Sequence, residues 1–226
     1  LRTYNKYSPF PEEINRQIVT KLGDFHLAPT EKAKSNLINE NVLEDFVCVT
    51  GNTVIDALFI SLEKISSEPS QRVKAISDSI AQRDVILVTA HRRENHGKGF
   101  ENICEALKKI ALSDEGILII YPVHLNPKVA GPVHEYLGKI NNILLIDPMN
   151  YQDFVWLMNH AKLILTDSGG IQEEAPSLGK PVLLLRDNTE RPEAVDAGTV
   201  LLVGDDVDII VEETQSLLKN IDRYKK

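Results

Sequence analysis

Hydrophobic residues gather in short uninterrupted runs over most of the chain. The clearest runs are residues 85–90, 117–121, 143–146, 163–166 and 181–185. They are rich in Val, Ile and Leu and do not alternate with polar residues, which is typical of strands buried on both faces of a parallel sheet. Between and after them, the spacing predicts a short strand at 199–203 and helices over 98–113, 127–138, 151–160, 169–178 and 205–220. Strands that alternate with helices in this way predict an α/β protein with a doubly wound parallel sheet.

The first 50 residues follow a different pattern. The prolines of Tyr7–Pro11 predict a rigid extended entry, after which Glu12 and Glu13 open a helix that runs to Leu22. A strand at 24–28, a helix at 30–41 capped by Thr30 and a strand at 46–49 follow. These units are too few to close a sheet. We therefore expect residues 1–50 to be the end of a first Rossmann-like domain and residues 51–226 to form a second one.

Two other parts of the chain, its first four residues and residues 51–84, carry weaker signals. Leu1-Arg2-Thr3-Tyr4 contains neither an initiator Met nor the beginning of a signal peptide, so we expect a chain that is cut at its N-terminus. Between residues 51 and 84 the pattern predicts only a linker-like stretch at 66–70.

Composition and charge exclude several classes of function. Hydrophobic residues make up 42% and charged residues 26%, as in ordinary folded proteins. The net charge of -8 is spread along the chain, which argues against a nucleic-acid partner, and no apolar run approaches the ~18–20 residues of a membrane span. Cys48 and Cys104 lie in apolar patterns without metal-ligand spacing, so we expect reduced core thiols in a cytoplasmic protein.

The strongest candidate site follows the run at 163–166. Ser168, Gly169 and Gly170 come directly after the predicted strand and open the next helix, so their amides are placed to bind phosphate. Glu174 lies one turn further on and can accept hydrogen bonds from the two hydroxyls of a ribose. The alternative is a solvated carboxylate that only stabilises the helix N-terminus.

Two other strand ends carry histidine. His91 and Arg92 follow the run at 85–90 and offer anion donors together with a group that titrates near neutral pH. The alternative there is a surface cluster in which Glu94 pairs with an arginine. His124 follows the run at 117–121 and is either a ligand contact or a structural histidine.

Two further side chains complete the candidate set. After the run at 181–185, Thr189 is placed to cap a short helix with Pro192 in its first turn, leaving Arg191 free to reach a phosphate or a sugar. Phe154, near the start of the helix at 151–160, is either a core residue or a platform for a ring.

Cofactor and metal motifs are missing from the sequence. It contains no GxGxxG, no Walker lysine loop, no HExxH and no Ser/His/Asp pattern. We therefore expect neither a nicotinamide nor an essential metal, and no cofactor at all.

Several of these strings together resemble one family, the non-hydrolysing UDP-N-acetylglucosamine 2-epimerases. The similarity runs in order over nearly the whole chain. It is carried by residues 7–13 (YSPFPEE), 49–56 (VTGNTVID), 91–95 (HRREN), 121–127 (YPVHLNP), 167–176 (DSGGIQEEAP) and 186–192 (RDNTERP).

The resemblance implies a two-domain fold like that of the glycosyltransferase-B enzymes and a reaction without cofactor. UDP-N-acetylglucosamine and UDP-N-acetylmannosamine would be interconverted by elimination of UDP to 2-acetamidoglucal and re-addition with the opposite configuration at C2. The resemblance also implies individual roles: Ser168, Gly169 and Gly170 on the diphosphate, Glu174 on the ribose, Arg191 and His91 at the phosphate and sugar, Glu12 as a catalytic carboxylate, and Arg92 and His124 in an effector site for a second UDP-N-acetylglucosamine.

Other functions remain open on the sequence alone. A hydrolysing 2-epimerase or a glycosyltransferase-B-type UDP-sugar transferase would share several of these motifs, and a fragment could be a non-catalytic UDP-binding module. For the epimerase we expect UDP and UDP-N-acetylhexosamines as partners, no nucleic acid or membrane, and an allosteric homodimer at full length that serves polysaccharide biosynthesis. Because the first sheet would precede Leu1, we expect the 226-residue chain to be inactive alone.

Overall fold

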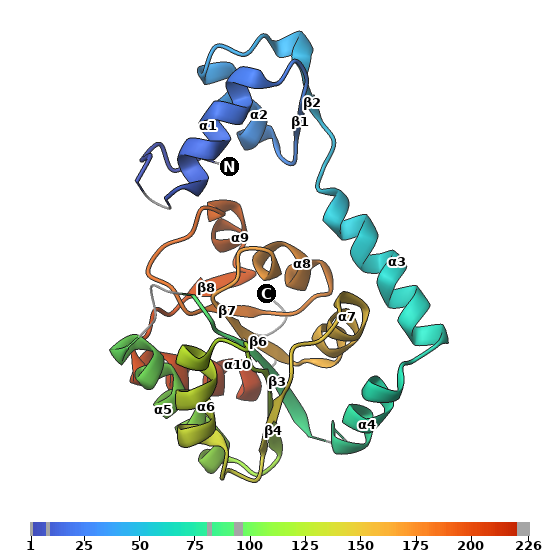
Figure 1. Ribbon diagram of the computed structural model, residues 1–226, viewed down its shortest axis with the longest axis vertical. Coiled ribbons are helices and arrows are strands. Elements are labelled where there is room, and N and C mark those ends of the chain that lie inside the picture. The colour runs from blue at the N-terminus through green and yellow to red at the C-terminus, as the bar shows by residue number, and fades with distance from the viewer. Residues whose placement is uncertain (1, 8–9, 81–82, 93–96, 221–226) are drawn as a thin grey trace. The chain divides into compact units, whose positions relative to one another are not determined.

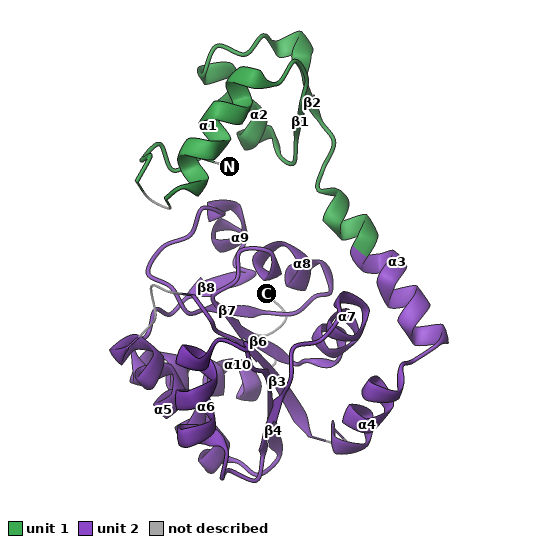
Figure 2. Cartoon of the chain, viewed as in Figure 1, with its two compact units in different colours: residues 1–57 green, residues 58–226 purple. Residues whose placement is uncertain are grey.

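The computed structural model describes residues 2–7, 10–80, 83–92 and 97–220. The chain divides into two compact units, Leu1–Ala57 and Leu58–Lys226 (Figure 2). The division falls inside helix α3 (Thr53–Ser67). Helix α4 (Gln71–Ile80) follows, and the hydrophobic pattern predicted neither helix. Within the described residues, no helix is both long enough and apolar enough to span a bilayer.

The first unit is small. It contains α1 (Glu12–Leu22), β1 (His26–Ala28), α2 (Glu31–Asn39), the 3-10 helix Glu44–Phe46 and β2 (Val47–Val49). The two strands are parallel, and the Thr30 hydroxyl accepts a hydrogen bond from the Ala33 amide at 3.1 Å, so the predicted cap is confirmed. Before α1 the chain forms turns at residues 6–7 and 10–11, so the prediction of an extended entry is wrong there.

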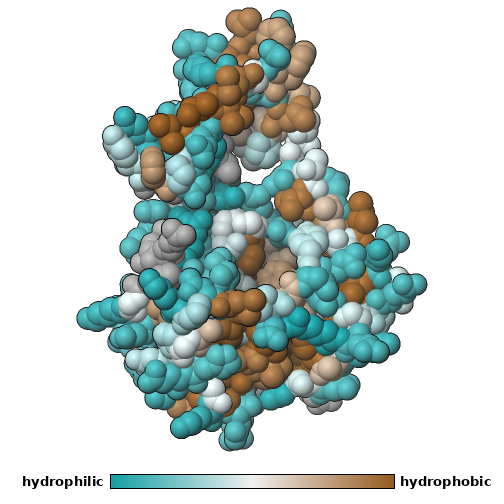
Figure 3. Space-filling view, viewed as in Figure 1, coloured by the Kyte–Doolittle hydropathy of each residue, from teal (hydrophilic) through white to brown (hydrophobic). Residues whose placement is uncertain are grey.

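Much of the apolar surface of the first unit stays exposed (Figure 3). Among its described residues, the apolar core consists of Ala28, Ala33 and Val47, with Leu37 and Val42 packed against them. The exposed apolar side chains include Val19, Leu22, Phe25, Leu27 and Leu43. Cys48 is also exposed, because the alternation along β2 turns Val47 inward and Cys48 outward. The prediction of a core thiol is therefore wrong for Cys48, whereas Cys104 is buried.

The second unit is built on a parallel sheet of six strands in the order β5-β4-β3-β6-β7-β8 (Figure 1). The strands are β3 (Asp84–Thr89), β4 (Ile117–Pro122), β5 (Ile143–Ile146), β6 (Leu163–Thr166), β7 (Val182–Leu184) and β8 (Val200–Leu202). The helices that connect and follow them are α5 (Lys98–Ser113), α6 (Pro127–Leu137), α7 (Tyr151–His160), α8 (Ile171–Ser177), α9 (Pro192–Asp196) and α10 (Val207–Lys219).

Helices cover both faces of this sheet. Along β3, Ile86 and Val88 join the core formed with α5, α6 and α10, while Val85 and Leu87 join the core formed with α3, α4, α7 and α8. This alternation explains why the strand sequences are apolar throughout, since both faces are buried. The predicted doubly wound α/β class is confirmed.

Candidate functional site

The strand order places a reversal of the chain connections at the carboxyl ends of β3 and β6. These two strands are neighbours, but β3 leads to α5 on one face of the sheet and β6 leads to α8 on the other. In open α/β sheets, ligands bind beyond the strand ends at such a reversal.

Buried hydroxyl groups tie the strand ends together. The Thr89 and Thr166 Oγ1 atoms lie 2.6 Å apart, and Thr166 Oγ1 also accepts the Ser168 amide at 2.9 Å. From β4, the Tyr121 hydroxyl donates to the Ala90 carbonyl oxygen at 2.5 Å. Burial raises the pKa of Tyr121 well above its usual value, and the nearby Asp167 carboxylate adds to the rise, so the phenol remains a donor. The polar edge of the sheet is therefore held in one arrangement.

Asp167 fixes the turn that follows β3. Its side chain is fully buried, and its Oδ2 accepts the amides of His91 and Arg92 at 2.8 and 2.7 Å. Its Oδ1 lies 3.6 Å from His91 Nδ1. The Asp167 carboxylate, after β6, thus orients the backbone and the His91 ring after the neighbouring strand β3.

His91 and His124 lie face to face. Their rings are nearly parallel, at 4° with centroids 5.4 Å apart, and His124 Nδ1 accepts the Asn126 amide at 3.1 Å. A cavity of about 380 Å³ opens beside His124, and Asp147 also lines it. The structure thus brings together the histidines of two predicted motifs. Glu94, proposed as an ion-pair partner in the alternative interpretation, falls outside the described residues.

The turn after β6 leaves backbone donors available. The Ser168 amide donates to Thr166 Oγ1, so in this structure it is not available to bind phosphate as expected. Within the described residues, the amides of Gly169 and Gly170 donate no hydrogen bond. The anion-binding potential of the turn therefore rests on the two glycines.

Arg191 is paired, contrary to the prediction that it is free. Its Nε donates to Glu173 Oε1, and an NH1 hydrogen bond of 2.7 Å reaches Glu190 Oε1. Its guanidinium lies over Gly169, since a Cβ built there would come within 2.7 Å of NH1. Arg191 itself is the N-cap residue of α9; the Thr189 hydroxyl accepts the Arg191 amide at 3.1 Å, so the predicted helix cap at Thr189 is wrong.

Glu190 holds two arginines at once. Its Oε2 receives Arg186 NH1 at 3.1 Å, and both the Arg186 and the Glu190 side chains are buried. Burial favours a higher pKa for Glu190, but its own backbone amide and the charges of Arg186 and Arg191 lower the pKa to about 2. The carboxylate therefore stays ionised and keeps Arg191 beside the glycine turn.

Glu174 spans from α8 toward α7. Its Oε2 accepts the Tyr151 hydroxyl at 2.8 Å, and its Oε1 lies 3.6 Å from the position that a Cβ on Gly170 would take. Burial raises the pKa of Glu174, with a contribution from the Glu173 charge, while the Tyr151 hydrogen bond works against the rise. One carboxylate oxygen is thus held by Tyr151 and the other faces the turn.

Comparisons with known proteins show the family of this chain. A family model described as UDP-N-acetylglucosamine 2-epimerase matches residues 1–226. The chain belongs to the UDP-N-acetylglucosamine 2-epimerase family. This confirms the resemblance seen in the sequence motifs.

Individual members of the epimerase family match over the whole chain. The UDP-N-acetylglucosamine 2-epimerase of Escherichia coli strain K12 is 55% identical over 231 residues, covering 100% of this chain and 61% of the relative. The crystal structure of UDP-GlcNAc 2-epimerase from Neisseria meningitidis bound to UDP-GlcNAc is 49% identical, with a TM-score of 0.88 and coverage of 100% and 61%. The S. aureus MnaA-UDP co-structure is 44% identical, with a TM-score of 0.93 and coverage of 100% and 60%. The chain therefore spans about 61% of the length of the curated relatives it matches.

Two further predicted site residues are Phe154 and Glu12. Phe154 is partly buried and packs against the core beneath α7, which favours the core interpretation. Glu12 is exposed at the start of α1, in the other unit. Its neighbour Glu13 is the buried one, and it accepts the amides of Thr3 and Tyr4 at 3.1 and 3.2 Å.

Four residues that shape the site were not predicted as site residues from the sequence: Tyr151, Asp167, Glu173 and Glu190. Asp167 carried a signal, since it is the polar residue directly after a buried strand. Tyr151 and Glu173 bind residues from other segments of the chain, and the sequence does not show those pairings. Glu190 binds Arg186 and Arg191 of its own turn, but the sequence does not show that the three side chains meet. Among the residues the structure describes, no group of three or more His, Cys, Asp or Glu side chains is arranged to hold a metal ion.

Proposed function

We propose that this chain belongs to an enzyme that interconverts UDP-N-acetylglucosamine and UDP-N-acetylmannosamine, and that its second unit binds the UDP moiety. The observation that carries the proposal is the family match together with the glycine turn, whose two available amides lie between Arg191 and Glu174. Donors for an anion and an acceptor for hydroxyl groups on either side of one turn suit a nucleoside diphosphate.

The roles proposed for the residues of the glycine turn follow from the negative charge that develops on UDP. Breaking the anomeric C–O bond leaves negative charge on UDP, which the amides of Gly169 and Gly170 and the guanidinium of Arg191 stabilise as it develops. In this scheme Ser168 contributes its side chain to the phosphate side and Glu174 accepts from the ribose. Phe154 packs on the core but is only partly buried, and it borders the nucleotide. No cofactor is needed for these steps.

The proton chemistry falls to Glu12 and His91. A base removes the proton from C2 as the C1–O bond breaks, giving 2-acetamidoglucal and UDP. UDP then adds back to C1 while a proton is delivered to the opposite face of C2, so atoms and charge balance over the cycle. Asp167 supports this proposal for His91 by holding its backbone and facing its ring.

For the whole protein we propose further properties that rest on the family resemblance alone. These are a cytoplasmic homodimer, a role in polysaccharide biosynthesis, and activation by a second UDP-N-acetylglucosamine near Arg92 and His124. The net charge of -8 supports a protein without a nucleic-acid partner.

The reaction type is tested in the longer protein that contains this chain. Turnover in D₂O should place deuterium at C2 of the product, because the C2 proton leaves as H⁺ and is replaced from solvent. His91→Ala should slow this turnover by roughly 100-fold, as expected for loss of a proton-transfer group. Mass spectrometry and NMR of the product report both effects.

Two outcomes would contradict the proposal. Protium retained at C2 would exclude an elimination that exchanges with solvent. Release of free N-acetylmannosamine in place of its UDP form would assign the protein to the hydrolysing epimerases.

A further inference from the structure

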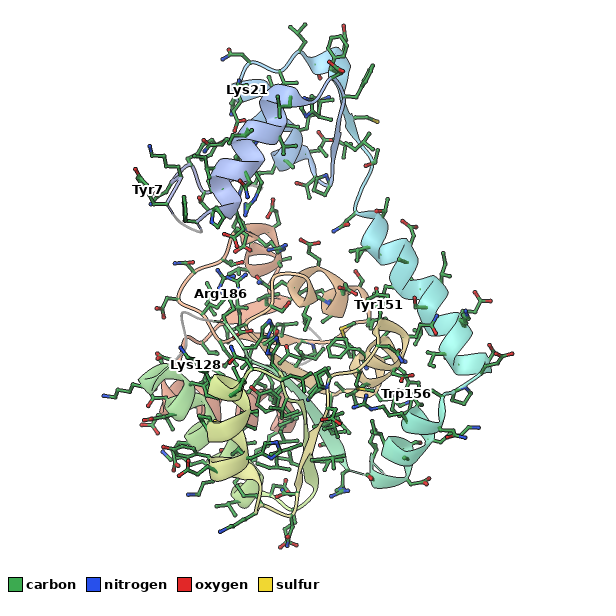
Figure 4. All side chains as sticks on the ribbon, in the orientation of Figure 1. Tyr7, Lys21, Lys128, Tyr151, Trp156 and Arg186 are labelled. Atoms are coloured by element: carbon green, nitrogen blue, oxygen red, sulfur yellow. The ribbon has the colours of Figure 1, made fainter. Side chains whose placement is uncertain are left out.

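Tyr151 and Glu174 join two helices beside the glycine turn. Tyr151 is the first residue of α7, and Glu174 lies on α8, 23 positions later in the chain. Figure 4 shows Tyr151 at the end of α7 that lies next to α8. The hydroxyl donates to Glu174 Oε2 at 2.8 Å, a good distance for a hydrogen bond to a carboxylate.

This hydrogen bond sets the direction of the carboxylate. With Oε2 held by Tyr151, Oε1 lies over Gly170, 3.6 Å from where a Cβ would stand. A glutamate side chain loses rotamer freedom when it is held in one geometry, so a donor that orients it before a ligand arrives removes part of the cost of binding.

The protonation states suit this arrangement. Partial loss of solvent around the hydroxyl and the hydrogen bond to Glu174 raise the pKa of Tyr151 to about 12, so the phenol keeps its proton at neutral pH. Burial raises the pKa of Glu174, and the Tyr151 hydrogen bond favours its charged form. Tyr151 therefore helps keep Glu174 as an acceptor.

We propose that Tyr151 is the positioning residue for ribose recognition. It orients Glu174 so that Oε1 and the remaining lone pair of Oε2 accept the two hydroxyls of the ribose. This inference rests on the proposed role of Glu174 at the nucleotide. It predicts that Tyr151 contributes to the preference for a ribonucleotide over its 2′-deoxy form without touching the nucleotide itself.

The test is calorimetric titration of the protein in the presence of EDTA with UDP, 2′-deoxy-UDP and inorganic diphosphate. Tyr151→Phe should weaken UDP binding about three- to tenfold and leave diphosphate binding within twofold. The reason is that UDP has the ribose hydroxyls that Glu174 is proposed to bind, whereas inorganic diphosphate has none. It should also reduce the ratio of the UDP to the 2′-deoxy-UDP affinity. Tyr136→Phe is the matched control, since Tyr136 is 39% exposed and Tyr151 42%, and it should change neither affinity.

A second variant separates this inference from the proposed function. Glu174→Ala should weaken UDP more than diphosphate, and adding Tyr151→Phe to it should cause no further loss. Equal losses for both ligands in Glu174→Ala would remove Glu174 from the ribose and contradict that part of the proposed function. If Glu174→Ala behaves as expected, unchanged UDP affinity in Tyr151→Phe overturns the inference alone. A full additional loss in the double variant also overturns it, because Tyr151 would then contact the nucleotide directly.

Discussion

Arg191 illustrates how one residue's surroundings change its expected chemistry. Two carboxylates, Glu173 and Glu190, hold its guanidinium over Gly169, and Glu190 is shared with Arg186. The local charge is therefore balanced, and the arginine is oriented rather than free. An oriented guanidinium binds an anion with less loss of side-chain entropy than a mobile one.

Gly169→Ala tests this placement. The new Cβ would come within 2.7 Å of Arg191 NH1, the far end of a flexible side chain, so the arginine should move while the fold remains. We expect a stability change below about 1 kcal/mol and about tenfold weaker diphosphate binding, the size of a lost hydrogen bond to a charged group. Calorimetric titration and urea unfolding measure the two effects.

Gly131 provides the control for this substitution. It lies in α6, where an added Cβ meets no atom within 4 Å apart from its chain neighbours. Pro132 follows it and disfavours a Cβ at this position of a helix, which offsets the gain from replacing glycine, so Gly131→Ala should change stability by less than about 1 kcal/mol and leave binding unchanged. Undiminished diphosphate affinity in Gly169→Ala would place the anion elsewhere.

At the scale of elements, the site depends on how β3, β4 and β6 end. The connections from β3 and β6 run to opposite faces of the sheet, so no helix joins their ends. Side-chain hydrogen bonds of Thr89, Thr166 and Tyr121, together with Asp167, link them instead. These hydrogen bonds hold the strand ends in one arrangement because they are wholly or partly shielded from water.

Thr166→Val tests the link between β3 and β6. Thr166 is fully buried, and its hydroxyl pairs with Thr89 and accepts the Ser168 amide. Loss of both bonds should lower the free energy of unfolding by about 1–3 kcal/mol and weaken UDP binding, since the turn loses its anchor. Thermal or urea unfolding and UDP titration are the measurements.

A second buried threonine serves as the reference. Among the described residues, Thr214 Oγ1 on α10 has no hydrogen-bond partner, so Thr214→Val should be neutral or stabilising. Equal losses in the two variants would show that the change of side chain, and not the hydrogen bonds of Thr166, sets the cost.

At the scale of the whole molecule, the ion pairs make stability depend on pH. Glu190 has a pKa of about 2 in the folded protein, and hydrogen bonds and Arg16 lower the pKa of Glu13 despite its burial. A depressed pKa stabilises the fold above the unfolded pKa of about 4.3, and this contribution is lost as pH falls toward the folded value.

Glu190→Gln isolates this effect. From pH 6 to pH 3 the wild-type protein should lose more free energy of unfolding than the variant, since the variant has no carboxylate to protonate at this position. Urea unfolding followed by Trp156, the single tryptophan and a buried residue of the second unit, measures both proteins. Identical pH dependence would show that the ion pairs of Glu190 contribute no net stability.

The fold of the second unit was predictable because its strands are buried on both faces. Uninterrupted apolar runs located β3 to β6 to within a residue or two, and the helices 98–113 and 151–160 match α5 and α7. Helices α3 and α4 were not predicted. In that region the hydrophobic pattern predicted only a linker-like stretch at 66–70. The buried residues of α3 and α4 pack on the sheet, which is formed by segments that come later in the chain.

The sequence by itself determined the α/β class, the strand ends that carry polar residues and the family motifs, because these depend on local pattern and residue type. Only the tertiary structure decided which side chains meet. Tyr151 with Glu174, Asp167 with His91, and Arg191 with Glu173 are 18 to 76 positions apart in the chain. Their pairing follows from the order of strands in the sheet and the packing of helices, which bring distant segments into hydrogen-bonding distance.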